Sequence, residues 1–123
     1  MNWKERYKKA NIIHIDLDGT ICNEECFTAE ECINATLNQA IWRWMWKIHN
    51  DPVDRKFIII NTARRTKFAR ETIEWLDKNS VPFDGVSFRK SPSDLYIDDK
   101  CVNINDFLKF IGGKYEKMDK SKN

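Results

Sequence analysis

Two carboxylates lie close together at the end of an apolar run near the start of the chain. Asp16 and Asp18 follow the run Ile12–Ile15, and Gly19 supplies a turn directly after them. The apolar run is typical of a buried strand, and the loop after such a strand is where open α/β sheets bind their ligands. Two carboxylates at this spacing repel each other unless a cation or a shared proton lies between them. The pair therefore indicates Mg²⁺ binding, acid–base chemistry, or both.

Polar side chains with related chemistry recur at three later points, each at or just after an expected strand end. They are Thr62, Ala63 and Arg64 after the apolar run 58–60, Lys90 within Phe88–Pro92, and Asp98 with Asp99 after Tyr96-Ile97. Taken singly, Thr62 also fits a helix N-cap and Lys90 a solvated surface lysine. All of them in register with the first carboxylates favour one site, since parallel strands end at the same edge of a sheet.

The sequence Asp16-Leu17-Asp18-Gly19-Thr20 resembles the first motif of the haloacid dehalogenase (HAD) superfamily of phosphotransferases. The three later points resemble the second, third and fourth motifs, in the order that the family requires. The resemblance extends over about residues 12–110. It implies a phosphatase in which Asp16 is the nucleophile that forms an aspartyl-phosphate and Asp18 is the general acid and then the general base.

The same resemblance implies Mg²⁺ as the cofactor. Asp16, the backbone carbonyl of Asp18 and the acidic pair Asp98 and Asp99 would be its ligands. The pattern leaves open which of Asp98 and Asp99 contacts the metal directly: alignment with the family's more common Gly-Asp form favours Asp99, and simple order after the strand favours Asp98.

The remaining roles concern the phosphoryl group. By resemblance, Thr62 and Ala63 at the second motif and Lys90 at the third would bind it. Arg64 resembles an arginine that some cap-less members use on the substrate.

Two groups of short, cap-less HAD proteins are the most similar in pattern. Small bacterial phosphatases associated with capsular polysaccharide synthesis share the Asp-x-Asp-Gly-Thr-x-Cys opening and the Tyr-x-Asp-Asp-Lys fourth motif. The phosphatase half of polynucleotide kinase-phosphatases shares the acidic pair and the arginine. The first group matches more positions, so the expected substrate is a sugar phosphate or another small phosphorylated metabolite. A polynucleotide 3′-phosphatase and a catalytically silent HAD-fold binding protein are the alternatives.

Length and charge restrict the architecture and the partners. At 123 residues the chain is expected to form a single domain, 1–123, with a core at about 11–111 and a basic C-terminal tail, 112–123. The basic ends at 4–9 and 114–122 are expected to be solvated tails. A net charge of +2 gives no general electrostatic case for nucleic acid, although Arg64, Arg65, Lys67 and Arg70 form a local basic cluster. The pattern does not indicate an oligomeric state.

The sequence shows neither a membrane-spanning segment nor a signal peptide, so we expect no membrane association and a cytoplasmic location. The thiols should then stay reduced. Cys22, Cys26, Cys32 and Cys101 form no CxxC pair, so zinc binding by the first three is disfavoured and buried or half-buried thiols are expected.

The elements that must position these residues alternate between strands and helices, which predicts an α/β fold: a Rossmann-like three-layer sandwich with a mostly parallel sheet, the HAD core without a cap domain. One helix is expected from a capping box at Thr28 and Glu31 to Asn50, in which Trp42 and Trp46 lie at the edge of the apolar stripe or, less favoured, form a contact surface. The other expected elements are strands at 57–60, at 81–83 or 86–88, and at 95–97, and helices at about 67–78 and at 104–111, the last stopped by Gly112-Gly113.

Overall fold

The computed structural model of the chain describes residues 2–88 and 101–120, with the backbone alone for 113–120. The chain divides into two compact units, Asn11–Pro92 and Met1–Ala10 with Ser93–Asn123. The larger unit contains the first and second motifs.

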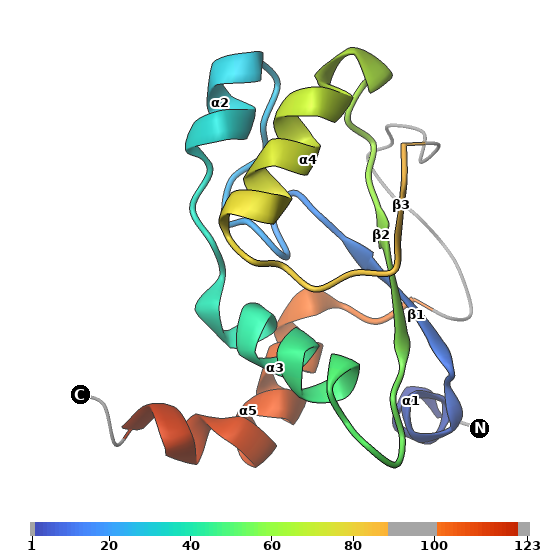
Figure 1. The fold of residues 1–123 in the computed structure, drawn as a ribbon. Coiled ribbons are helices and arrows are strands. Elements are labelled where there is room, and N and C mark those ends of the chain that lie inside the picture. The colour runs from blue at the N-terminus through green and yellow to red at the C-terminus, as the bar shows by residue number, and fades with distance from the viewer. Residues whose placement is uncertain (1, 89–100, 121–123) are drawn as a thin grey trace. The chain divides into compact units, whose positions relative to one another are not determined.

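A three-stranded parallel sheet forms the centre of the larger unit (Figure 1). Its strands are β1 (Ile12–Asp16), β2 (Phe57–Asn61) and β3 (Gly85–Ser87), in the order β1-β2-β3. The register aligns Asp16 with Asn61 and Asn61 with Ser87, so the three strands end level with one another. The mixed, parallel α/β character that the sequence predicts is confirmed. The three-layer sandwich and the HAD core stay predictions, and the strand expected at 95–97 lies outside the described residues.

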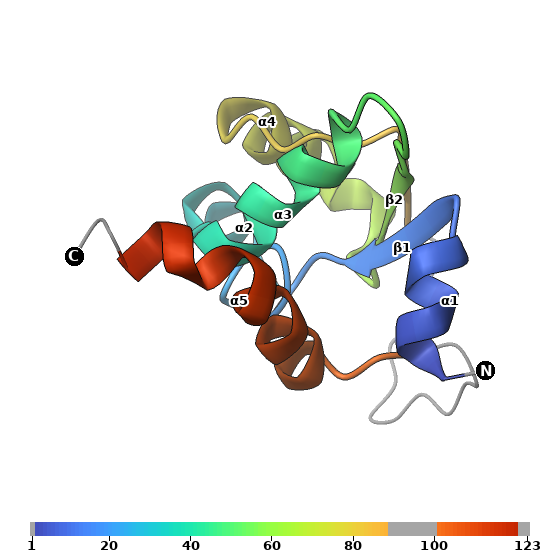
Figure 2. The same cartoon turned by 90° about the horizontal axis from the view of Figure 1, so that it is seen from below.

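Helices α2 (Ala29–Asn34), α3 (Gln39–His49) and α4 (Ala69–Lys78), with the short 3₁₀ turn η1 (Thr66–Phe68), lie on one side of this sheet (Figures 1 and 2). Parallel strands require such crossover segments, because each strand must start again from the same edge of the sheet. The fully buried side chains include Ile58 and Ile60 from β2, Met45 from α3 and Leu76 from α4. This apolar layer fixes the strand ends that carry the polar residues.

The expected single helix over 28–50 is wrong, because the chain leaves the helical path between Asn34 and Gln39. Two polar contacts explain the interruption. The Glu24 carboxylate accepts hydrogen bonds from the backbone N–H and the hydroxyl of Thr36 (2.8 and 2.6 Å), and the Asn38 side chain caps α3 by accepting from Ile41 N–H (3.2 Å). Ile33, in the last turn of α2, is 46% exposed. The N-cap at Thr28 is confirmed, with its hydroxyl accepting from Glu31 N–H.

Two tryptophans of α3 form hydrogen bonds with the turn after α4. The indole N–H groups of Trp42 and Trp46 both donate to the carbonyl of Ser80, at 3.1 and 2.9 Å. Ser80 has a backbone φ of 53°, a left-handed conformation that residues other than glycine adopt rarely. Both indoles are half-buried, which is compatible with the expected position at the edge of the apolar stripe.

The smaller unit contains two helices, α1 (Trp3–Lys9) and α5 (Ile104–Lys120, red in Figure 2). Trp3 and Tyr7 of α1 each contact Phe107 and Phe110 of α5, with ring centroids 5.1–6.1 Å apart and tilted or edge-on geometry. The Asn2 side chain caps α1 by accepting from Glu5 N–H (3.0 Å).

Residues 4–9 and 114–120, expected to be tails, are helical instead. The expected solvation holds for 4–9, where no side chain is buried. The expected stop at Gly112-Gly113 and the non-helical tail from 112 are wrong. A glycine inside a helix costs about 1 kcal/mol relative to alanine, which weakens a helix without ending it. Residues 114–120 include three lysines, one glutamate and one methionine, which are compatible with helix, and α5 continues to Lys120.

None of the helices in the described part of the chain has an apolar stretch long enough to cross a bilayer.

Candidate functional site

The loop after β1 presents the two carboxylates of the first motif. Asp16 is the last residue of β1 and is half-buried, whereas Leu17 is completely buried and separates it from Asp18. The chain then turns tightly, because the backbone N–H groups of Thr20, Ile21 and Cys22 all donate to the carbonyl of Leu17 (3.2, 2.9 and 3.1 Å). Gly19 makes this turn with φ of 75°, where a side chain would be strained.

A buried arginine holds the carboxylate of Asp18. The Arg64 side chain has no solvent exposure, and its Nε and Nη2 lie 3.0 and 2.6 Å from Asp18 Oδ1, with Nε also 3.3 Å from Oδ2. Its third nitrogen, Nη1, donates to the hydroxyl of Thr72 on α4 (3.0 Å). The guanidinium therefore joins the β1 loop to α4, and its charge is directed at Asp18.

Burial alone would lower the pKa of Arg64, but the hydrogen bonds and the charge of Asp18 outweigh it and raise the pKa above its ordinary range. The guanidinium is thus a permanent cation. Asp18, with its side chain 20% exposed, has a fixed counter-charge on one side and access to solvent on the other.

The segment after β2 carries the second motif. The backbone N–H of Thr62 donates to the carbonyl of Ser87 (2.9 Å), which continues the sheet pairing beyond the end of β2. The Thr62 hydroxyl accepts from the N–H of Arg64 (3.1 Å). This hydrogen bond closes a short turn that aims the Arg64 side chain back toward the β1 loop. Thr62 is buried and Ala63 half-buried.

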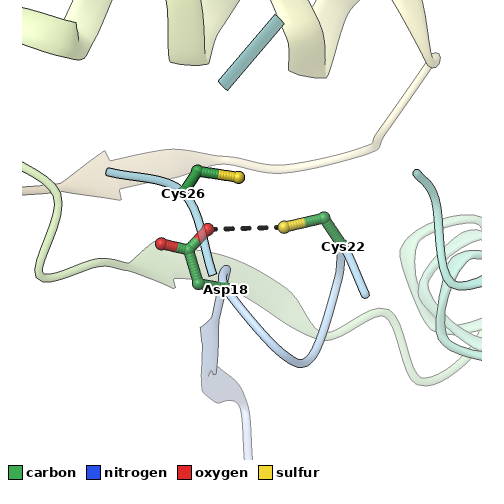
Figure 3. Close-up of side chains that lie close together, drawn as sticks. All are labelled: Asp18, Cys22 and Cys26. Carbon is green, nitrogen blue, oxygen red and sulfur yellow. Dashed lines mark hydrogen bonds between the residues drawn. The ribbon is translucent and has the colours of Figure 1, made fainter. Parts of the chain in front are cut away.

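Two cysteines complete the surroundings of Asp18 (Figure 3). The thiol of Cys22 lies 3.4 Å from Asp18 Oδ1 and also contacts the carbonyls of Leu17 and Glu24, at 3.5 and 3.3 Å. Burial, reinforced by the negative charge of Asp18, raises the pKa of Cys22 to about 12. Burial raises the pKa of Cys26 to about 11. Both groups are therefore neutral thiols at physiological pH.

The structure brings together part of the expected site. Asp16, Asp18, Thr62 and Arg64 come from the ends of β1 and β2, and Arg64 contacts Asp18 directly. Lys90, Asp98 and Asp99 lie outside the described residues, so their roles stay predictions. Cys22 and Cys26 were not expected near the site. The available signal was their spacing, since Asp18, Cys22 and Cys26 recur every four residues along the loop.

The basic cluster beside the site divides into two parts. Arg64 points inward, whereas Arg65, Lys67 and Arg70 are exposed. Arg70 pairs with Glu74 one turn further along α4 (3.4 Å), and Lys67 lies over the ring of Phe68. Exposed contacts of this kind contribute little energy and leave the cations accessible to a ligand.

No family model, curated protein or solved structure matches the chain. The described site is thus characterised by its own geometry: a carboxylate at a strand end, a second carboxylate paired with a buried guanidinium, and a threonine at the neighbouring strand end.

Proposed function

We propose that this protein is a Mg²⁺-dependent phosphomonoester hydrolase of the HAD type that acts on a sugar phosphate or another small phosphorylated metabolite. The observation that carries the proposal is the level ending of β1 and β2, with Asp16 opposite Asn61. This register supports a shared site for the carboxylates of the first motif and Thr62 of the second, the groups that phosphoryl transfer requires at one sheet edge.

In the proposed reaction Asp16 attacks the phosphorus atom of the substrate. A bond forms from its carboxylate oxygen to phosphorus, the ester P–O bond breaks, and the leaving oxygen takes a proton from Asp18. Asp18 then accepts a proton from the water that attacks the aspartyl-phosphate, which releases phosphate and restores Asp16. Arg64 Nη2, 2.6 Å from Asp18 Oδ1, holds this side chain in place beside the end of β1.

The donor set at the end of β1 fits Mg²⁺, since carboxylate and carbonyl oxygens are the ligands that this ion prefers. Asp16 and the carbonyl of Asp18 would hold it, together with Asp98 or Asp99. When bound, the ion would neutralise the phosphoryl oxygens and the nucleophile. In this proposal Thr62 hydrogen-bonds a phosphate oxygen and Lys90 adds a positive charge.

The test is turnover of a panel of phosphorylated sugars, nucleotides and 3′-phosphorylated oligonucleotides in the presence of Mg²⁺. We expect hydrolysis that EDTA abolishes and Mg²⁺ restores. Asp16→Asn removes the nucleophile with almost no change of shape, so turnover should fall to the background level. Asp77→Asn, an exposed carboxylate on α4, is the matched control and should retain full activity. Turnover above a few per cent in Asp16→Asn, or full activity in EDTA, would contradict the proposal.

A further inference from the structure

Three metal-ligating side chains converge on the loop after β1. One oxygen of Asp18 and the sulfur atoms of Cys22 and Cys26 all lie within 4.8 Å of one another (Figure 3). Both thiols are buried and Asp18 is half-buried. No other group of three such residues meets this criterion within the described part of the chain.

One of the spacings in this cluster is close to that around a tetrahedral ion. With metal–sulfur bonds of about 2.3 Å and metal–oxygen bonds of about 2.1 Å, neighbouring ligand atoms around zinc lie roughly 3.5–3.8 Å apart. The sulfur of Cys22 is already 3.4 Å from Asp18 Oδ1. Cys26 lies in the loop between β1 and α2, where its thiol contacts the carbonyl of Glu31 at 3.4 Å and interacts with the side chain of Cys22. Its sulfur lies within 4.8 Å of both other ligand atoms.

The charges of the cluster also suit a divalent ion. Arg64 already neutralises Asp18, and its Nη2 lies 3.7 Å from the sulfur of Cys22. If both thiols ionise on metal binding, their two negative charges balance the two positive charges of the ion. Two S–H bonds break, two metal–sulfur bonds form, and two protons pass to the solvent.

We propose that Asp18, Cys22 and Cys26 form a site for a thiophilic divalent cation of the zinc class, with the fourth coordination position open to water. Two sulfur ligands select zinc, cadmium or cobalt over Mg²⁺, which requires oxygen ligands. The site is distinct from the proposed Mg²⁺ position, which uses Asp16 and the carbonyl of Asp18. The two sites share one residue, and the thiophilic ion takes its carboxylate.

The shared use of Asp18 has a consequence for hydrolysis, and this consequence rests on the proposed function. A carboxylate bound to zinc neither donates nor accepts the reaction's protons, so hydrolysis stops while the site is occupied. Binding itself does not depend on the phosphatase proposal, and the two are measured separately.

The experiment is titration of the full-length, fully reduced chain with Co²⁺ in the absence of substrate, followed by absorption spectroscopy. We expect one Co²⁺ per chain, an intense sulfur-to-cobalt charge-transfer band, visible bands of tetrahedral cobalt, and displacement by one equivalent of Zn²⁺. Cys22→Ser and Cys26→Ser should each weaken binding by more than the ~10-fold lost when only a supporting residue is removed. Asp18→Asn should weaken it while the charge-transfer band persists, because both sulfur ligands remain.

Cys32→Ala with Cys101→Ala is the matched control, since only the two proposed thiols then remain and the full spectrum should persist. A wild-type chain without a charge-transfer band overturns the proposal, as does a spectrum that survives Cys22→Ser but disappears in the control. If the chain binds Co²⁺ as described but hydrolyses no phosphate ester, this inference stands and the proposed function is refuted.

Discussion

A guanidinium without solvent exposure needs a counter-charge, and Arg64 has one in Asp18. The two groups meet through a forked pair of hydrogen bonds, at 3.0 and 2.6 Å, while Thr72 takes the third nitrogen. Removing one partner of a buried ion pair leaves an uncompensated charge, which costs more free energy than the intact pair contributes. The ion pair therefore stabilises the conformation of the β1 loop as well as forming part of the site.

A double-mutant cycle measures the interaction free energy between Arg64 and Asp18. Asp18→Asn should lower the free energy of unfolding by roughly 3–5 kcal/mol, because it leaves the buried Arg64 charged and unpaired. Arg64→Met should cost less, because the carboxylate that it leaves unpaired is 20% exposed. The double variant should be less destabilised than the sum of the two single variants, since neither charge remains. Urea unfolding of the four proteins gives the coupling energy.

The control for this cycle is the adjacent residue. Arg65 is exposed, so Arg65→Met should change the free energy of unfolding by no more than about 0.5 kcal/mol. Additive effects of Arg64→Met and Asp18→Asn would show that the two side chains do not interact in solution.

Residue types and their position at strand ends were enough to predict Asp16, Asp18, Thr62 and Arg64 as neighbours at one sheet edge. The inward direction of Arg64 was not predictable, because it depends on the Thr62–Arg64 turn and on Thr72 eight residues later. The two cysteines were missed for a related reason. Their four-residue spacing was visible, but the approach of Cys22 to Asp18 follows from the backbone hydrogen bonds that close the loop onto Leu17.

At the scale of the elements, Asp84, which directly precedes β3, forms hydrogen bonds with β2. Asp84 Oδ2 accepts a hydrogen bond from the N–H of Ile58 (2.8 Å), and its Oδ1 accepts one from Arg55 (2.7 Å). Its own N–H donates to the carbonyl of Ile58 (2.8 Å). These contacts set the register in which Gly85 pairs with Ile59, and hence the level strand ends at the site.

This anchor predicts sensitivity to acid. Burial alone would raise the pKa of Asp84, but the hydrogen bond from Ile58 and the interactions with Arg55 and His49 outweigh it, and the pKa lies below the ordinary 3.8. The stabilisation is therefore complete above pH 3.8 and is lost as the pH falls through the folded-state value. Asp84→Asn should lower the free energy of unfolding near neutral pH by about 1–3 kcal/mol and flatten its decline in acid. Denaturant unfolding at a series of pH values measures both effects.

Asp54→Asn serves as the comparison, because that side chain is 61% exposed and pairs only loosely with Lys56 (3.6 Å). It should leave the acid branch of the stability curve unchanged. A wild-type acid decline that persists undiminished in Asp84→Asn would remove Asp84 from this role.

The periodicity of apolar residues predicted that most of the helices and strands exist, but not where they begin and end. The strands at β1 and β2 and the helix at α4 follow directly from apolar runs and a 3.6-residue stripe. The break between α2 and α3 was hidden because Leu37 and Ile41 keep the helical spacing, while Glu24, twelve residues before Thr36, supplies the competing hydrogen bonds. The continuation of α5 past two glycines reversed a local stop signal, because a glycine inside a helix costs only about 1 kcal/mol relative to alanine, which weakens a helix without ending it.

At the scale of the whole molecule, charge is nearly balanced but unevenly placed. The chain carries a net charge of +2, yet Arg65, Lys67 and Arg70 are exposed together after the second motif. A small sugar phosphate does not require three accessible cations, whereas an oligonucleotide with a terminal phosphate offers flanking phosphates to each of them. This placement is the specific observation behind the alternative polynucleotide 3′-phosphatase.

Salt dependence distinguishes the two substrate classes. For the favoured small metabolite, added salt should act only through weak screening, and Arg65→Ala or Lys67→Ala should leave KM nearly unchanged. For an oligonucleotide, the logarithm of affinity should fall steeply with the logarithm of salt concentration, and each variant should reduce that slope by about one unit. Steady-state kinetics with both substrates from low to high salt decides the question. Asp77→Asn, outside the cluster, is the reference.

The doubly accepting carbonyl of Ser80 gives the molecule an optical property. It holds the indoles of Trp42 and Trp46 with ring centroids 6.5 Å apart and ring planes inclined by 77°. Because the two indoles lie this close in a fixed, steeply inclined arrangement, we expect their electronic transitions to couple and to give paired circular-dichroism bands of opposite sign. Loss of these bands would then report separation of α3 from the turn after α4 in the unlabelled protein.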